Sequence, residues 1–139
     1  MNLIFADTFF WIALTNPEDG SHEQAKGFIA AARPGGIVTT EQVLTEYLNY
    51  FSAWGPSYRH KISTNVEQML ENPTTRVILS SKEIFLAGLS LYRARPDKGY
   101  SLTDCVSMET MRREGLTEVL TNDRHFEQEG FRPLFRDSQ

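Results

Sequence analysis

Two acidic residues follow apolar segments that are typical of buried strands. Asp7 comes directly after residues 2–6, and Asp123 lies just after residues 118–121. In open parallel sheets, ligands bind beyond the carboxyl ends of the strands. If these two strands are neighbours in one sheet, the two carboxylates face each other at the same edge, although they come from opposite ends of the chain.

Two further acids are placed where they can reach that edge. Asp104 lies in the first turn of a predicted helix, and Glu46 flanks the apolar stripe of another. Four convergent carboxylates repel one another and raise one another's pKa values. Mg²⁺ and Mn²⁺ prefer oxygen ligands, and such ions can activate a water and stabilise the leaving oxygen of a phosphodiester. The pattern therefore predicts a site that binds Mg²⁺ or Mn²⁺ and hydrolyses phosphodiester bonds. Its metal ligands and catalytic acids would be Asp7, Glu46, Asp104 and Asp123.

Each of these acids also has a simpler interpretation. Asp7, Asp104 and Asp123 all stand at the beginning of predicted helices, where acidic side chains commonly cap free backbone N–H groups. Glu46 could be a solvated residue at the flank of an amphipathic helix. Taken one at a time, the residues leave both interpretations open, and only their arrival at one edge of the sheet favours a shared site.

The elements that position these acids alternate along the chain. Apolar segments predict strands over residues 2–6, 37–39, 76–79, 118–121 and 132–135. Helical spacing and capping patterns predict helices over residues 8–14, 21–32, 41–54, 57–71, 80–94, 101–113 and 123–128. Strands separated by helices form parallel βαβ units with helices on both faces. The expected fold is an α/β domain with three layers, α/β/α, around a central, mostly parallel sheet of four to five strands.

Length and composition agree with one globular domain over residues 1–139. Apolar residues make up 40% of the chain and charged residues 23%, which excludes a mainly disordered protein. The one cysteine, Cys105, allows no disulfide within the chain, as is typical of a reducing compartment. The apolar run at residues 8–14 is too short to span a membrane and lacks the basic flank of a signal peptide. We therefore expect a cytoplasmic protein with no membrane partner.

The net charge constrains how an anionic substrate could be bound. A formal net charge of −4 disfavours a protein that grips nucleic acid by charge neutralisation alone. An acidic surplus concentrated at a metal site remains compatible with such a substrate, because bound cations invert the local field.

Four short motifs at the predicted acids resemble the PIN-domain family. Their order and spacing extend over nearly the whole chain, and it is the four together that make the resemblance specific. In chain order they are Phe5-Ala6-Asp7-Thr8, Leu44-Thr45-Glu46, Ser101-Leu102-Thr103-Asp104-Cys105 and Leu120-Thr121-Asn122-Asp123-Arg124-His125-Phe126, the last followed by Gly130-Phe131.

The resemblance implies a metal-dependent endoribonuclease that uses the four acids named above. RNA as the substrate is implied by the resemblance alone. The compact chain looks most like the VapC-type toxins of type II toxin–antitoxin systems, which implies a small antitoxin partner and a homodimer. The resemblance also points to Thr8, Asp97 and Asn122 as secondary site residues. Each of these could equally be a local cap or a loop residue.

Basic residues near the acid cluster could hold an RNA backbone by charge. They are Arg95, Lys98 and Arg124. The alternative for each is a solvated position at a helix end, where a cation pairs with the helix dipole. His125 is two residues from Asp123 and could touch a substrate phosphate, but we interpret it as a surface or packing residue.

Other functions stay open at this point. A PIN-like nuclease could process RNA without being a toxin, and a PIN-like module could bind RNA or protein without cutting. Phosphoryl transfer through an aspartate nucleophile fits less well. Haloacid-dehalogenase-type phosphatases need a second aspartate two residues after the first, and Phe9 stands at that position.

Overall fold

Five parallel strands form the central sheet. The computed structural model describes residues 3–135. The strands are β1 (Ile4–Ala6), β2 (Ile37–Thr40), β3 (Thr75–Ile78), β4 (Glu118–Leu120) and β5 (Arg132–Pro133). They lie in the order β3-β2-β1-β4-β5, and each neighbouring pair is parallel. The expectation of a parallel sheet of four to five strands is confirmed.

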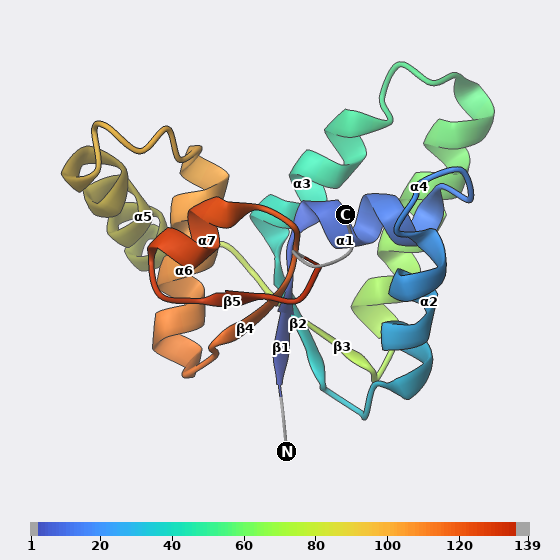
Figure 1. The fold of residues 1–139 in the computed structure, drawn as a ribbon. Coiled ribbons are helices and arrows are strands. Elements are labelled where there is room, and N and C mark those ends of the chain that lie inside the picture. The colour runs from blue at the N-terminus through green and yellow to red at the C-terminus, as the bar shows by residue number, and fades with distance from the viewer. Residues whose placement is uncertain (1–2, 136–139) are drawn as a thin grey trace.

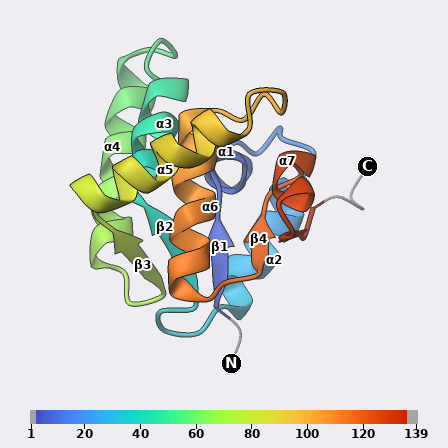
Figure 2. The same ribbon diagram turned by 90° about the vertical axis from the view of Figure 1, so that its left-hand side faces the viewer.

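Helices cover both faces of this sheet. They are α1 (Thr8–Thr15), α2 (His22–Ala31), α3 (Glu41–Tyr50), α4 (Pro56–Glu71), α5 (Lys82–Ala94), α6 (Leu102–Glu114) and α7 (Arg124–Gln128). Helices α5 and α6 lie on one side of the strands, and α1, α2 and α4 lie on the other (Figure 1). Figure 2 looks onto the α6 side and shows α5 and α6 in front of the sheet with α2 behind it. The predicted three-layer α/β/α arrangement is therefore confirmed.

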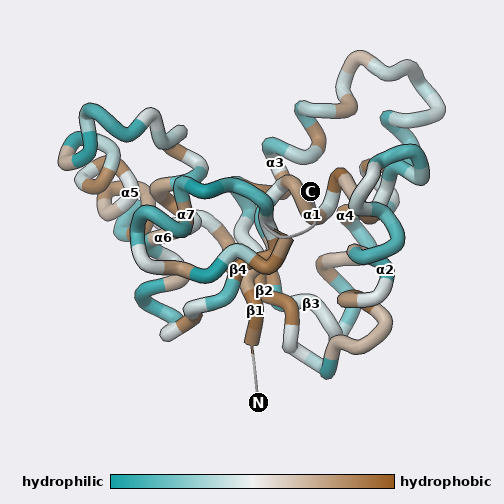
Figure 3. Tube along the Cα trace, viewed as in Figure 1, coloured by the Kyte–Doolittle hydropathy of each residue, from teal (hydrophilic) through white to brown (hydrophobic). Residues whose placement is uncertain are grey.

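The central strand β1 and its neighbour β4 are apolar on both faces. Phe5 and Ala6 in β1 and Val119 and Leu120 in β4 are fully buried. Strands of a parallel sheet carry such continuous apolar runs because helices exclude water from both faces. The hydropathy colouring shows the same contrast, with hydrophobic strands in the centre and more hydrophilic segments outside (Figure 3).

Local signals place most helix boundaries to within one residue, and the larger differences from the sequence prediction are at α5 and α3. The Ser101 hydroxyl accepts from the backbone N–H of Asp104, and the Asp104 carboxylate accepts from that of Ser101, so the predicted capping box of α6 is present. Helix α5 is capped by Ser81, whose hydroxyl accepts from the N–H of Ile84, so the helix starts later than the predicted residue 80. Helix α3 ends at Tyr50 rather than at residue 54, because the chain turns there before α4.

The pairing of β1 with β4 decides which residues meet at the carboxyl edge of the sheet. Phe5 pairs with Val119 and Ala6 with Leu120. The next residues along the two strands, Asp7 and Thr121, therefore leave the sheet side by side.

Among residues 3–135, no helix is both long enough and apolar enough to cross a membrane.

Candidate active site

An open pocket of about 500 Å³ lies at the carboxyl edge of the sheet. All four acids predicted from the sequence contribute to its walls. The lining residues are Asp7, Thr8, Phe9, Glu46, Asp104, Thr121, Asn122, Asp123 and Arg124. They come from the junction of β1 and α1, the middle of α3, the first turn of α6 and the stretch from the end of β4 to the start of α7. The fold thus brings together four segments that are far apart in the sequence.

Asp7 is the most buried acid of the pocket. It occupies the N-cap position of α1, but its side chain makes no capping hydrogen bond. Its Oδ2 instead accepts a hydrogen bond from the Thr121 hydroxyl at 3.0 Å. The pKa of Asp7 is raised to about 7, first because the carboxyl is buried and then because Asp104 is negatively charged nearby. This acid is therefore held in a position where its own charge is unfavourable unless a cation is present.

Thr121 was not predicted from the sequence, and it links two sides of the pocket. While its hydroxyl donates to Asp7, the same oxygen accepts from the backbone N–H of Asp123 at 3.2 Å. A sequence signal did exist, because Thr121 directly follows β4 as Asp7 directly follows β1. Threonines and serines are common at strand ends, however. The position of Thr121 indicates a contact with Asp7 only once β1 and β4 are known to be neighbours.

Asp104 and Asp123 combine a capping role with a place in the pocket. Asp104 belongs to the capping box of α6, and Asp123 Oδ1 accepts from the N–H of His125 at the start of α7. The pKa of Asp104 is raised, first by burial, with added repulsion from Asp123 and Glu46. The capping interpretation is thus correct for both residues, and it does not compete with a role at the pocket.

Glu46 reaches the pocket from the side of α3. The Thr8 hydroxyl donates to its Oε1 at 2.5 Å. Since Thr8 follows Asp7 at the start of α1, this contact ties the carboxylate of α3 to the segment that carries the most buried acid. Glu46 is therefore held at the pocket by a residue distant in sequence. A glutamate that was simply solvated at the flank of a helix would have no such partner.

His125 lies against two of the acids, which its interpretation as a surface or packing residue did not foresee. Its Nδ1 is 3.6 Å from Asp104 Oδ2 and 3.4 Å from Asp123 Oδ1, and this buried nitrogen makes no hydrogen bond. One ligand atom from each of the three side chains lies within 4.8 Å of the others. The two carboxylates supply oxygen ligands of the kind that Mg²⁺ and Mn²⁺ prefer, whereas an imidazole nitrogen is a ligand for softer divalent metals.

Within residues 3–135, the acids of the pocket have no lysine or arginine partner. Among the described residues, the ion pairs of Asp104 and Asp123 are with His125 alone, and no Lys or Arg pairs with Asp7 or Glu46. A group of carboxylates without such partners fits a cation-binding site, because neutralisation by a metal removes their mutual repulsion.

The other candidates divide into three groups. Thr8, Asn122 and Arg124 line the pocket. Asp97 and Lys98 are exposed in the loop between α5 and α6, outside the pocket lining. Arg95 forms an ion pair with Glu129, a partner that the sequence prediction did not include.

Comparison with known proteins agrees with this geometry. The model of the PIN domain family matches residues 4–131. The 23S rRNA-specific endonuclease VapC20 of Mycobacterium tuberculosis is 26% identical over 132 residues, which cover 93% of this chain and 95% of the relative. The crystal structure of that protein, described as a sarcin–ricin-loop-cleaving toxin, superposes with a TM-score of 0.80 over 92% of this chain and 95% of the other.

A second solved structure supports the fold only. FitAcB from Neisseria gonorrhoeae gives a TM-score of 0.66 at 16% identity, over 94% of this chain and 96% of that one. Together with the family match over most of the chain, the layered fold and the acid-lined pocket define the class: the protein belongs to the PIN domain family. Among known members it is similar to VapC20 over nearly its whole length.

Proposed function

We propose that this protein is a metal-dependent endoribonuclease and the toxin of a toxin–antitoxin pair. The observation that carries the proposal is the pocket itself, which four carboxylates line without a Lys or Arg partner among the described residues. The similarity to an rRNA-specific endonuclease over 93% of the chain supports RNA as the substrate class.

The pocket residues have separate tasks in this proposal. Asp7, Asp104, Asp123 and Glu46 would hold Mg²⁺ or Mn²⁺ through their carboxylate oxygens. A bound ion would supply a water of lowered pKa and charge stabilisation for the leaving oxygen. Thr121 orients Asp7, and Thr8 orients Glu46. Such outer contacts determine how well a ligand is presented to a metal.

The substrate would approach over the rim of the pocket. Arg124 lines it and is placed to contact a phosphate of the RNA backbone. Lys98, in the loop before α6, would add a further contact. VapC20 is named for 23S rRNA and for the sarcin–ricin loop, so an oligonucleotide with that loop is the first defined substrate to test.

The proposal includes a small antitoxin that holds the enzyme inactive, a homodimer, and action in the cytoplasm. Exposed apolar side chains on α5, namely Phe85, Leu86 and Tyr92, supply surface for packing against another chain. Light scattering on the purified protein gives its mass in solution, and a mass of one chain would contradict the homodimer.

The deciding experiment is cleavage of total RNA and of the loop oligonucleotide in EDTA, Mg²⁺ or Mn²⁺. Wild-type protein is compared with Asp7→Asn and Asp104→Asn, and Glu118→Gln serves as a control because Glu118 lies outside the pocket, where it pairs with Arg132. We expect cleavage that requires metal, disappears in both aspartate variants and persists in the control. Cleavage that survives in EDTA or in both variants would refute the proposed site. Absence of both cleavage and metal binding would favour a non-catalytic PIN-like module.

A further inference from the structure

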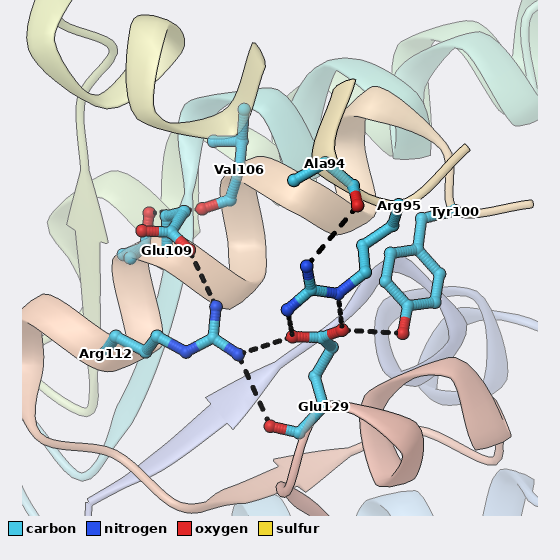
Figure 4. A network of polar contacts seen from close by, with 8 residues as sticks. Ala94, Arg95, Tyr100, Val106, Glu109, Arg112 and Glu129 are labelled. Atoms are coloured by element: carbon cyan, nitrogen blue, oxygen red, sulfur yellow. Dashed lines mark hydrogen bonds and ion pairs between the residues drawn. The ribbon is translucent and has the colours of Figure 1, made fainter. Parts of the chain in front are cut away.

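A second polar cluster lies beside the pocket, where three helices end (Figure 4). Its centre is Glu129, which directly follows α7. Arg95 follows α5, Arg112 belongs to the last turn of α6, and Tyr100 lies in the segment just before α6. We call these four residues the Glu129 cluster. Its members join the two elements that carry Asp104 and Asp123.

Both carboxylate oxygens of Glu129 are fully engaged. Oε2 accepts from Arg95 Nε at 2.7 Å and from the Tyr100 hydroxyl at 2.9 Å. Oε1 accepts from a guanidinium nitrogen of Arg112 at 2.7 Å and from one of Arg95 at 3.4 Å. Arg112 also donates to the backbone carbonyl of Glu129. The carboxylate is thereby fixed in position and orientation, because charge-assisted hydrogen bonds are the strongest of their kind.

Glu129 is buried although it is ionised. Its side chain is 5% exposed. Burial by itself raises the pKa of this carboxyl, but the hydrogen bonds from Arg95, Arg112 and Tyr100 outweigh it and lower the pKa to about 2. The Glu129 carboxyl therefore stays ionised at neutral and mildly acidic pH.

Tyr100 connects this cluster to the acids of the pocket in two ways. Its ring packs against the His125 ring, with centroids 5.2 Å apart, and His125 Nδ1 lies against Asp104 and Asp123. Tyr100 also immediately precedes Ser101, whose hydroxyl and N–H form the capping box with Asp104. A shift of Tyr100 would consequently move the support of both acids.

We propose, on the basis of the metal-dependent function proposed above, that Glu129 is a positioning residue that sets the separation of Asp104 and Asp123 through Tyr100. Glu129 fixes the end of α7, whose start carries Asp123, and through the Tyr100 hydroxyl it fixes the start of α6, which carries Asp104. Ligand geometry within a fraction of an ångström decides how tightly an ion is held. The Glu129 cluster thus contributes to metal affinity without touching the metal.

A purely structural role predicts something different. Loss of a buried, fully hydrogen-bonded carboxylate destabilises any fold, whatever its effect on a neighbouring site. A structural residue would lower the melting temperature and leave the metal affinity of the folded protein unchanged. The positioning role requires that the metal affinity changes even in a variant whose melting temperature hardly changes. Tyr100→Phe should be such a variant, because it removes one hydroxyl and keeps the ring.

The test is Mn²⁺ titration by calorimetry on wild-type protein, Glu129→Gln, Tyr100→Phe and the double variant, with melting temperatures measured without metal. Glu118→Gln is the matched control, because Glu118 also accepts from an arginine, Arg132 at 2.8 Å, but away from the pocket. We expect Mn²⁺ to bind about tenfold more weakly to Glu129→Gln and about threefold more weakly to Tyr100→Phe. The double variant should bind no more weakly than Glu129→Gln, since both changes act along one route. The control should bind as wild type does.

Each other outcome decides against the inference. Equal Mn²⁺ affinity of wild type and both single variants would make the Glu129 cluster structural only. Should Glu129→Gln not fold, Tyr100→Phe decides by itself, with unchanged affinity as the contradicting result. Strictly additive losses in the double variant would refute the route through Tyr100. A wild-type protein that binds no Mn²⁺ would overturn the proposed function as well, whereas normal wild-type binding with unaffected variants overturns only this inference.

Discussion

Asp7 and Glu129 are both buried carboxylates, and the protein treats them in opposite ways. Asp7 has one neutral hydroxyl partner, Thr121, and lies among other acids, so its pKa is raised to about 7. Glu129 has two arginines and a tyrosine hydroxyl, so its pKa is lowered to about 2. Burial raises the pKa of both carboxyls, and only Glu129 has basic partners that reverse the effect.

This contrast separates stability from function in one small fold. A buried charge without a partner is unfavourable and persists where the surrounding structure holds it in place for a task. A buried charge with complete hydrogen bonding holds elements together. The pocket is therefore a place where the apo-protein gives up stability, and the Glu129 cluster, which lies next to it, is a place where stability is gained.

The largest expected effect is on catalysis at Asp7, the acid that no lysine or arginine pairs with among the described residues. Asp7→Asn should lower the rate of RNA cleavage by at least about 100-fold. Loss of a direct metal ligand should lower activity more than loss of a residue that only supports a ligand, which costs about 10–100-fold. Without metal at neutral pH, the same variant should be at least as stable as wild type, since a repelled charge is removed. Cleavage rates and melting temperatures test both parts. A clear fall in melting temperature would show that Asp7 is stabilising, and the contrast with Glu129 would be lost.

The next effect concerns the paired acid. Glu129→Gln should lower the free energy of unfolding by about 2 kcal/mol, because an amide cannot accept all the bonds that the carboxylate accepts from two arginines. Urea denaturation without metal measures this difference. Glu118→Gln, which removes a partly exposed ion pair, should lower it by less than about 1 kcal/mol. Equal losses in the two variants would mean that burial of Glu129 contributes nothing extra.

The two carboxylates should also impose opposite pH dependences on stability. The pKa of Asp7 is raised from 3.8 to about 7, so its favourable effect is present below pH 3.8 and is lost as pH rises to about 7. The pKa of Glu129 is lowered from 4.5 to about 2, so its contribution is present above pH 4.5 and is lost as pH falls towards 2.

Denaturation curves in EDTA across this range distinguish the two contributions. Asp7→Asn should flatten the decline of stability between about pH 4 and pH 7, and Glu129→Gln should flatten the decline below pH 4.5. If Asp7→Asn left the upper decline unchanged, another group would be responsible for it.

The smallest effect compares two arginines. Arg124 lines the pocket, whereas Arg95 is bound to Glu129. Arg124→Ala should weaken binding of a non-cleaved RNA severalfold and reduce the salt dependence by about one phosphate contact, with little change in stability. Arg95→Ala should instead lower the melting temperature. Fluorescence anisotropy at several salt concentrations, with melting curves, tests the pair, and weaker RNA binding by both variants alike would remove the distinction.

Much of this site was predictable because its parts are local. Asp7 follows an apolar strand, and Asp104 stands at the capping-box position after Ser101, and both features depend on a few neighbouring residues. Helix ends were harder to place. The chain turns after Tyr50, and α5 is capped by Ser81 rather than by the serine before it, since two adjacent serines offer equivalent capping side chains.

Contacts between side chains that are far apart in the sequence were not predicted. Glu129 is 34 residues from Arg95, 29 from Tyr100 and 17 from Arg112. Nothing in the local pattern distinguishes this glutamate from the exposed acids of the chain. The same holds for His125, whose approach to Asp104 depends on how α7 packs against the start of α6.

Sequence patterns were enough to predict the elements, their alternation and the acids at the ends of strands, because periodicity and capping are short-range effects of burial and backbone hydrogen bonding. Which strand ends are neighbours, and therefore which carboxylates repel one another and which are paired, depends on the folded arrangement. Desolvation and charge–charge interactions vary with distances in space, and the strand order β3-β2-β1-β4-β5 sets those distances.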